Sequence, residues 1–272
     1  MMRRVLLHLG LHKTGMTAAQ SFLHENRKLI WPRFALVLPY KTRNSGLSES
    51  ATRHSLYRLD STLAGFGSHL HAFLDDLDFG ARRGLILSEE NFAGLRPSRN
   101  KREGYGAAPE LAETLVSVVR RRFLGHETEI TIYISLRARD QWLRSLWAHD
   151  LQKSRTVQDL DAFSSDLAHL PSLQETADAV RNRLPSVTVR TEWMEALQNH
   201  RLGAGAPLAE FLNLPPELSS QLVGPAHGTP TFSDDVLQEI LALNRSSLDD
   251  AAMITQKKAL IQSAQNELAR QT

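Results

Sequence analysis

A short stretch near the start of the chain has the residue types that hold an anion. GLHKTGMT (Gly10–Thr17) lies between an apolar run and an amphipathic stretch, so the sequence predicts a strand–turn–helix junction. Backbone N–H groups in such a turn, and the start of the helix after it, attract phosphate-like groups. Gly10, Gly15 and Thr17 match the spacing of a Walker A phosphate-binding loop.

The lysine of this turn is displaced from its Walker position. Met16 occupies that position, and Lys13 lies three residues earlier. The Walker lysine reaches the β- and γ-phosphates beside a hydroxyl that holds magnesium. A lysine inside the turn is better placed to meet the bridging oxygen and terminal group of a phosphosulfate. The simpler interpretation is a structural turn whose Lys13 is solvated, because short glycine motifs are common.

A second set of polar residues follows the clearest strand-like run, EITIYISL. Arg137 comes directly after that run, where ligands of open α/β sheets bind, and Ser145 lies eight residues further on. The guanidinium offers a permanently charged, forked donor for a phosphate, and Ser145 adds a hydroxyl. Alternatively, Arg137 pairs with Asp140, the expected cap of the next helix, and Ser145 is an ordinary helix residue.

Together the two motifs resemble those of the sulfotransferases that use 3′-phosphoadenosine-5′-phosphosulfate (PAPS). The turn is similar to the family's 5′-phosphosulfate loop, and Arg137 with Ser145 to its 3′-phosphate motif. The resemblance extends over roughly the first 200 residues and is closest to bacterial and carbohydrate-type members. It implies PAPS as the sulfate donor, with no metal. It also implies that one run of residues lines the 5′-phosphosulfate site: His12, Lys13, Thr14, Gly15, Met16 and Thr17.

The chain departs from this family pattern at several positions. His12 replaces the usual proline, and Met16 replaces a threonine whose hydroxyl grips the phosphosulfate. Because one neutral hydrogen bond is worth about 1 kcal/mol, we expect weaker cofactor binding rather than none. Thr191-Glu192 stands where many relatives have Tyr-Glu after the last strand, with Trp193 as a substitute aromatic. Gly224–Thr231 is the counterpart of the loop that closes over the cofactor.

Sulfuryl transfer to a hydroxyl also needs a group that takes the acceptor's proton. The expected strand Leu85–Leu87 leads into Glu89 and Glu90, and alternation along a strand turns only one of them to a cleft. By resemblance to bacterial relatives, Glu90 is the base, and Lys13 stabilises the leaving phosphate. Alternatively, both glutamates cap the next turn or face water. The rival bases are five histidines: His24, His54, His69, His71 and His149.

The elements that position these residues alternate between short apolar runs and amphipathic stretches. This pattern predicts an α/β, P-loop-like fold of three layers, with a mainly parallel central sheet flanked by helices. The expected strands are Arg4–Leu9, Phe34–Leu38, Leu85–Leu87, Glu129–Leu136 and Val187–Arg190. The expected helices are Gly15 or Met16 to about Leu29, then 56–77, 109–123, 140–153, 157–169, 172–183 and 248–270. Residues 41–56 and 96–107 are expected to be loops, the latter mobile. We expect one domain over 1–272 with a C-terminal helical extension at about 205–272.

Composition narrows the classes of function. The chain has 272 residues, 42% hydrophobic, and a net charge of only +2, which supports a packed core and argues against nucleic-acid binding. It has no cysteine, which excludes disulfides, thiolate metal sites and cysteine nucleophiles. The apolar start meets His8 too early for a signal peptide, and no stretch is long enough to span a membrane. We therefore expect a cytoplasmic protein without stable membrane insertion.

The function implied by the resemblance is transfer of a sulfuryl group from PAPS to an acceptor hydroxyl. The acceptor would be a small molecule or a glycan, and its hydroxyl would belong to a carbohydrate or a glycolipid in the second case. Two alternatives stay open: a P-loop nucleotide kinase or NTPase, and a catalytically inactive relative that serves as a binding module. The helix expected over 248–270 is long enough to pack on a second copy, so a homo-oligomer also stays open.

Overall fold

A parallel sheet of five strands organises most of the chain. The structure is a computed structural model that describes residues 2–226 and 232–271. The strand order is β2-β3-β1-β4-β5, and every neighbouring pair is parallel. The strands are β1 (Arg3–Gly10), β2 (Phe34–Val37), β3 (Gly84–Ser88), β4 (Thr128–Leu136) and β5 (Thr188–Trp193). The predicted α/β fold with a parallel central sheet flanked by helices is confirmed.

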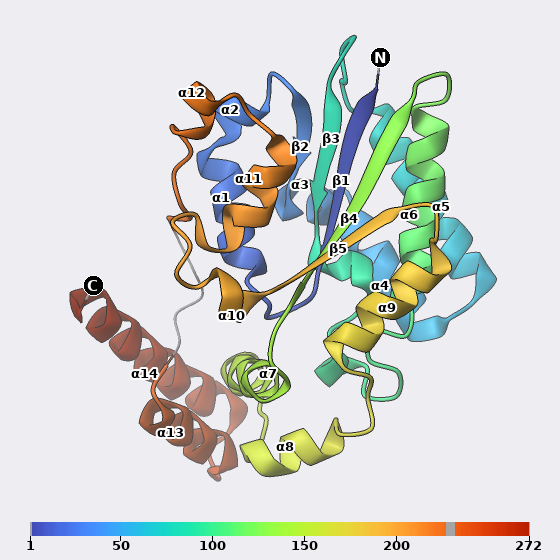
Figure 1. Cartoon of the computed structure of the whole chain (residues 1–272). Coiled ribbons are helices and arrows are strands. Elements are labelled where there is room, and N and C mark those ends of the chain that lie inside the picture. The colour runs from blue at the N-terminus through green and yellow to red at the C-terminus, as the bar shows by residue number, and fades with distance from the viewer. Residues whose placement is uncertain (1, 227–231, 272) are drawn as a thin grey trace. The chain divides into compact units, whose positions relative to one another are not determined.

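Helices cover both faces of this sheet (Figure 1). One face carries α1 (Met16–Glu25), α2 (Arg27–Ile30) and α11 (Ala206–Leu212), and the other α5 (Asp60–Asp75), α6 (Ala108–Arg122) and α9 (Leu173–Arg183). Because side chains alternate along a strand, Leu6, Ile86 and Tyr133 pack with Phe22 of α1 in one hydrophobic cluster. The buried Val5 and Leu7 therefore point to the opposite face. Burial on both faces explains why these strands read as continuous apolar runs.

The remaining elements of the described residues fall into two groups. Those connected with the sheet are α3 (Pro39–Asn44), α4 (Leu47–Tyr57), the 3₁₀ turns η1 (Glu90–Ala93), η2 (Pro97–Arg99) and η3 (Gly203–Gly205), α10 (Met194–Leu197) and α12 (Pro216–Ser219). The others are α7 (Arg139–Lys153), α8 (Leu160–Asp166), α13 (Asp234–Arg245) and α14 (Asp250–Gln271). No helix within the described residues is both long and apolar enough to cross a membrane.

The chain divides into two compact units. One comprises Met1–Ala138 and Leu170–Gly228 and holds the sheet; the other comprises Arg139–His169 and Thr229–Thr272 and is helical. In the helical unit, the buried Lys257 ammonium donates to the Leu151 and Ser154 carbonyls at the end of α7, at 3.0 and 2.8 Å. The expectation of a single domain with a C-terminal extension stays a prediction. Residues 227–231 of the expected closing loop lie outside the described residues.

Two predicted elements are wrong in their boundaries. The helix expected from Gly15 or Met16 to Leu29 is interrupted at Asn26, whose side chain donates to the carbonyls of Phe22 and Val223. Asn26 thus ties the end of α1 to a segment about 200 residues away, which no local pattern reveals. Strand β5 runs on to Trp193, so Thr191-Glu192 lies within the strand and not after it.

The loop expected over 41–56 is also wrong, because α3 and α4 occupy that range. Its polar composition hid a short helix that begins at Pro39, and proline at a first helical position is a recognised start signal. The segment 96–107 does lack an α-helix and is built of turns around η2, and α6 begins directly after it at Ala108.

We expect Asn26→Ala to destabilise the sheet-containing unit by about 1–3 kcal/mol. Asn26 is 3% exposed, and its side-chain amide bonds both the carbonyl and the N–H of Val223, so the substitution removes both of these hydrogen bonds. Urea denaturation followed by circular dichroism measures this change. The matched control is Asn44→Ala, an exposed asparagine at the end of α3, which should change stability by less than about 0.5 kcal/mol. Equal effects of the two substitutions would contradict the assigned role of Asn26.

Candidate functional site

The predicted site residues gather at the carboxyl ends of the strands. Strand β1 lies between β3 and β4 and leads into the turn Gly10–Thr17, which we call the anion loop. Glu89 and Glu90 follow β3, and Arg137 follows β4. In open parallel sheets, ligands bind in a crevice outside the carboxyl ends of the strands. The crevice forms where the connections from two neighbouring strands run to opposite sides of the sheet. The anion loop lies at that point.

Positive backbone angles shape the anion loop. Gly10, Lys13 and Gly15 have φ values of 108°, 66° and 89°. A side chain at position 10 would put its Cβ 3.3 Å from the Cβ of Glu90, so Gly10 lets the end of β1 approach the candidate base. Gly15 is the N-cap of α1, and the first N–H groups of that helix have no acceptor within it.

Strand β4 holds the loop through hydroxyl groups. Thr14 Oγ1 donates to the Leu11 carbonyl at 2.6 Å and lies 2.6 Å from Ser135 Oγ, which in turn donates to the Gly10 carbonyl at 2.8 Å. Thr14 is only 1% exposed, so its hydroxyl belongs to the fold. Met16 is also buried and points into the core, whereas Thr17 is exposed on the first turn of α1.

A hydrogen bond joins the two sequence motifs. Arg137 Nη1 donates to the carbonyl of Lys13 at 3.1 Å, so a permanent positive charge lies directly behind the anion loop. The sequence predicts Asp140 as the cap of the next helix, and this prediction is wrong. Helix α7 begins at Arg139, so Asp140 lies in its first turn. The N–H of Ala138, just before this helix, instead donates to Glu195 Oε1 at 3.0 Å.

Ser145, the other half of the second motif, lies on α7 in the helical unit. Its pairing with Arg137 in one phosphate site stays a prediction.

The two glutamates after β3 have different surroundings. Glu89 is fully buried; its carboxylate accepts from the N–H of Asn91 at 3.2 Å and from Thr42 Oγ1 at 2.5 Å. It therefore caps η1, as one of the two sequence interpretations held. Glu90 has a side chain that is 18% exposed, and it accepts from Arg43 Nη2 at 2.7 Å and from Gln20 Nε2 at 3.1 Å. Only Glu90 can meet a ligand.

These surroundings shift the pKa values of the two carboxyl groups in opposite directions. Burial, with the neighbouring charge of Glu90, raises the pKa of Glu89 to about 7. Burial alone would also raise the pKa of Glu90, but hydrogen bonds from its own backbone N–H and from Gln20, together with the Arg43 guanidinium, oppose burial, and that pKa lies below its ordinary value. Glu90 is therefore ionised at neutral pH and able to accept a proton, while Glu89 is only partly ionised.

His12 is held by side chains that the sequence did not single out. The Tyr105 hydroxyl lies 3.0 Å from both the backbone nitrogen and Nδ1 of His12, and Asn91 Oδ1 lies 3.1 Å from its Nε2. Tyr105 comes from the segment expected to be a mobile loop. No spacing in the sequence marks Tyr105 or Asn91, whereas the Pro39 helix signal would have placed Thr42 and Arg43 on a helix.

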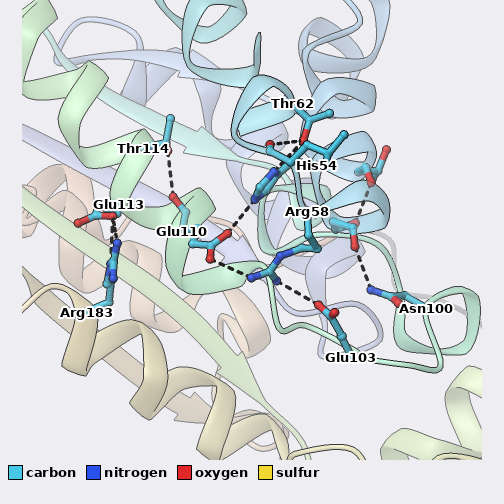
Figure 2. A network of polar contacts seen from close by, with 12 residues as sticks. His54, Arg58, Thr62, Asn100, Glu103, Glu110, Glu113, Thr114 and Arg183 are labelled. Carbon is cyan, nitrogen blue, oxygen red and sulfur yellow. Dashed lines mark hydrogen bonds and ion pairs between the residues drawn. The ribbon is translucent and has the colours of Figure 1, made fainter. Parts of the chain in front are cut away.

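Among the rival bases, His54 is buried and has a partner at each ring nitrogen. It lies on α4, not in a loop, is 2% exposed, and contacts Thr62 Oγ1 at 3.0 Å and Glu110 Oε2 at 2.9 Å. Figure 2 shows this pair within a network that includes Arg58 and continues to Glu103. A ring enclosed in this way has no face for a substrate. Within residues 2–226 and 232–271 no cluster of three acidic, histidine or cysteine side chains is placed to hold a metal.

Comparisons with known proteins find a likeness in structure and none in sequence. No model of a known protein family matches the sequence, and no curated protein matches it. Among solved structures, a sulfotransferase from Alicyclobacillus acidocaldarius is similar, with 12% identity and a TM-score of 0.45 over 96% of this chain and 94% of that one. At this identity and TM-score the likeness does not carry a function to this chain.

The raised pKa of Glu89 predicts a pH dependence of stability. A carboxyl whose pKa is higher in the folded than in the unfolded chain stabilises the fold below about pH 4.5, and this stabilisation is lost as the pH rises through about 7. We expect unfolding free energy from urea titrations to fall by up to about 3 kcal/mol from this group between those limits. Glu89→Gln should flatten the profile, whereas Glu49→Gln, at an exposed position, should leave it unchanged. Parallel profiles for the wild type and Glu89→Gln would contradict the assignment.

Proposed function

We propose that this chain is a sulfotransferase that transfers a sulfuryl group from PAPS to the hydroxyl of an acceptor. The observation that carries the proposal is the hydrogen bond between Arg137 and the Lys13 carbonyl, because it unites the two motifs on which the resemblance rests. Glu90 lies against the same loop at Gly10. An anion-binding turn, a fixed guanidinium and an ionised carboxylate thus occur at one edge of the sheet.

The anion loop fits the donor through its backbone more than through its hydroxyls. Lys13, Gly15 and Thr17 would bind the 5′-phosphosulfate, with help from the N–H groups at the start of α1. Arg137 would bind the 3′-phosphate, with Ser145 as its predicted partner. PAPS, when bound, supplies the sulfuryl group and leaves as the adenosine bisphosphate. Lys13 is the residue that would neutralise charge on the leaving phosphate.

On the acceptor side, Glu90 is the proposed base. Its ionised carboxylate would accept the hydroxyl proton of the acceptor as the oxygen attacks. Arg43 and Gln20 hold the two carboxylate oxygens and so fix the direction from which that proton arrives. Glu89 does not take part directly because it is fully buried. The acceptor is proposed to be a glycan, a glycolipid or a smaller hydroxyl compound, and the site of action to be the cytoplasm.

The P-loop kinase or NTPase is less well supported. Position 16, where such an enzyme has its lysine, holds a buried methionine. One observation favours an inactive binding module: Thr14 and Met16 both point into the fold, which leaves the loop with few side-chain donors. Binding of the donor and transfer from it therefore need separate tests.

We expect 3′,5′-adenosine bisphosphate to bind in isothermal titration calorimetry, and ATP with magnesium to bind at least tenfold more weakly (~1.4 kcal/mol). Lys13→Ala and Arg137→Ala should each weaken binding of the bisphosphate by about tenfold to a hundredfold, because each removes a charge-assisted contact worth about 1.5–3 kcal/mol. Lys28→Ala, at an exposed position on α2, is the matched control and should change nothing. Stronger binding of ATP with magnesium would overturn the proposal.

Loss of the base should separate catalysis from binding. We expect Glu90→Gln to retain affinity for the bisphosphate within about threefold and to lose at least a hundredfold in transfer rate, since general-base catalysis contributes roughly 10²–10⁴-fold. The rate is the formation of bisphosphate from PAPS with a panel of glycan and small-molecule hydroxyl acceptors. Glu25→Gln, an exposed glutamate of α1, is the control. Undiminished transfer in Glu90→Gln would remove Glu90 from the mechanism, and no transfer by the wild type would favour the binding module.

A further inference from the structure

The hydrogen bonds around His12 admit one consistent arrangement of protons. The backbone N–H of His12 donates to the Tyr105 hydroxyl, so that hydroxyl uses its own proton toward Nδ1 of the same residue. Nδ1 is then an acceptor, and the ring proton lies on Nε2, which donates to Asn91 Oδ1. The side-chain nitrogen of Asn91 in turn donates to the Ser48 hydroxyl on α4 at 2.7 Å. Each polar atom in this chain of contacts has a complementary partner.

This arrangement persists across the neutral pH range. Burial lowers the pKa of His12 to about 4, so its ring stays neutral and keeps Nδ1 as an acceptor. Burial likewise raises the pKa of the Tyr105 hydroxyl, which therefore stays protonated. The two rings stack with their centroids 5.9 Å apart and their planes at 17°.

Tyr105 is itself fixed by a network on the far side of its segment. Asn100 donates to the carbonyls of Ser55 and Gly104, both at 3.2 Å. Arg58 lies 3.3 Å from Glu103 and 2.9 Å from Glu110, which binds together the segment and the start of α6 (Figure 2). The segment expected to be a surface loop is therefore anchored on both sides of Tyr105.

We propose that Tyr105 is a positioning residue for the anion loop. Its hydroxyl takes up the His12 N–H, which would otherwise compete for a ligand or stay unpaired, and leaves the N–H groups further along the loop to face the anion. Through His12 and Asn91 the same contacts fix the loop relative to Glu90, the residue beside Asn91. The effect of Tyr105 on binding of the adenosine bisphosphate rests on the proposed function. The hydrogen bonds themselves are present in the chain without ligand.

The first test is made without ligand. In hydrogen–deuterium exchange of the full chain, Tyr105→Phe should speed exchange of the His12 amide at least tenfold, and also that of the Ala19 amide, which donates to the Gly15 carbonyl of the anion loop at 3.0 Å. The matched control is Tyr133→Phe, a buried tyrosine of β4, which should leave these two amides unchanged. Unchanged exchange of the His12 or the Ala19 amide in Tyr105→Phe would overturn the proposal.

Because Tyr105 is 5% exposed, a second variant guards against a failure to fold. His12→Ala keeps the backbone N–H and its bond to Tyr105 but removes the ring that reaches Asn91. We expect the amide of residue 12 to stay protected and that of Ala19 to exchange faster. Faster exchange of residue 12 as well, or no change at Ala19, would contradict the assigned contacts.

The second test uses 3′,5′-adenosine bisphosphate in calorimetry. Tyr105→Phe and His12→Ala should each weaken binding about tenfold, and the double variant also about tenfold and not a hundredfold, because both break one arrangement. Full additivity, or unchanged affinity in Tyr105→Phe, would overturn the positioning role. If the wild type does not bind the bisphosphate, the proposed function fails, and the exchange of the His12 and Ala19 amides alone decides whether Tyr105 positions the loop.

Discussion

The central strand β1 is hydrogen-bonded along both edges, to β3 and to β4, and the anion loop begins at its last residue, Gly10, which pairs with Ile134 of β4. Pairing on both sides leaves the end of β1 no freedom to move relative to Glu90 or to Arg137. The register with β4 shifts between His8 and Gly10, where the chain turns out of the sheet. The sheet therefore places the start of the anion loop, Glu90 and Arg137 at one edge.

Side chains from distant segments then define the shape of the loop. Ser135 of β4 and Arg137, just after it, donate to the carbonyls of Gly10 and Lys13, while the Tyr105 hydroxyl accepts from the N–H of His12. Each contact gives one backbone group of the loop a partner within the fold. A loop prepared in this way loses less conformational entropy on binding an anion than a mobile one. The departure from proline at position 12 is accommodated because Tyr105 satisfies the additional N–H.

The two adjacent glutamates illustrate how burial divides charge. Glu89 and Glu90 follow one another, yet Glu89 is enclosed beside Thr42, whereas Glu90 meets Arg43 and Gln20 at the surface of the site. Two like charges so close together are costly, and the structure reduces the cost by raising the pKa of the enclosed one. The exposed carboxylate is thereby the one that stays ionised and available to a substrate.

The sequence by itself determined the strands, most of the helices and the parallel α/β fold, because apolar periodicity and helix signals are local properties of the chain. It also placed Lys13, Glu90 and Arg137 at strand ends, which share one edge in a parallel sheet. Only the tertiary structure decided that Thr14 and Met16 point inward, that α3 brings Arg43 to Glu90, and that Tyr105 binds His12. Those outcomes depend on contacts between residues tens of positions apart, which leave no periodic trace in the residues themselves.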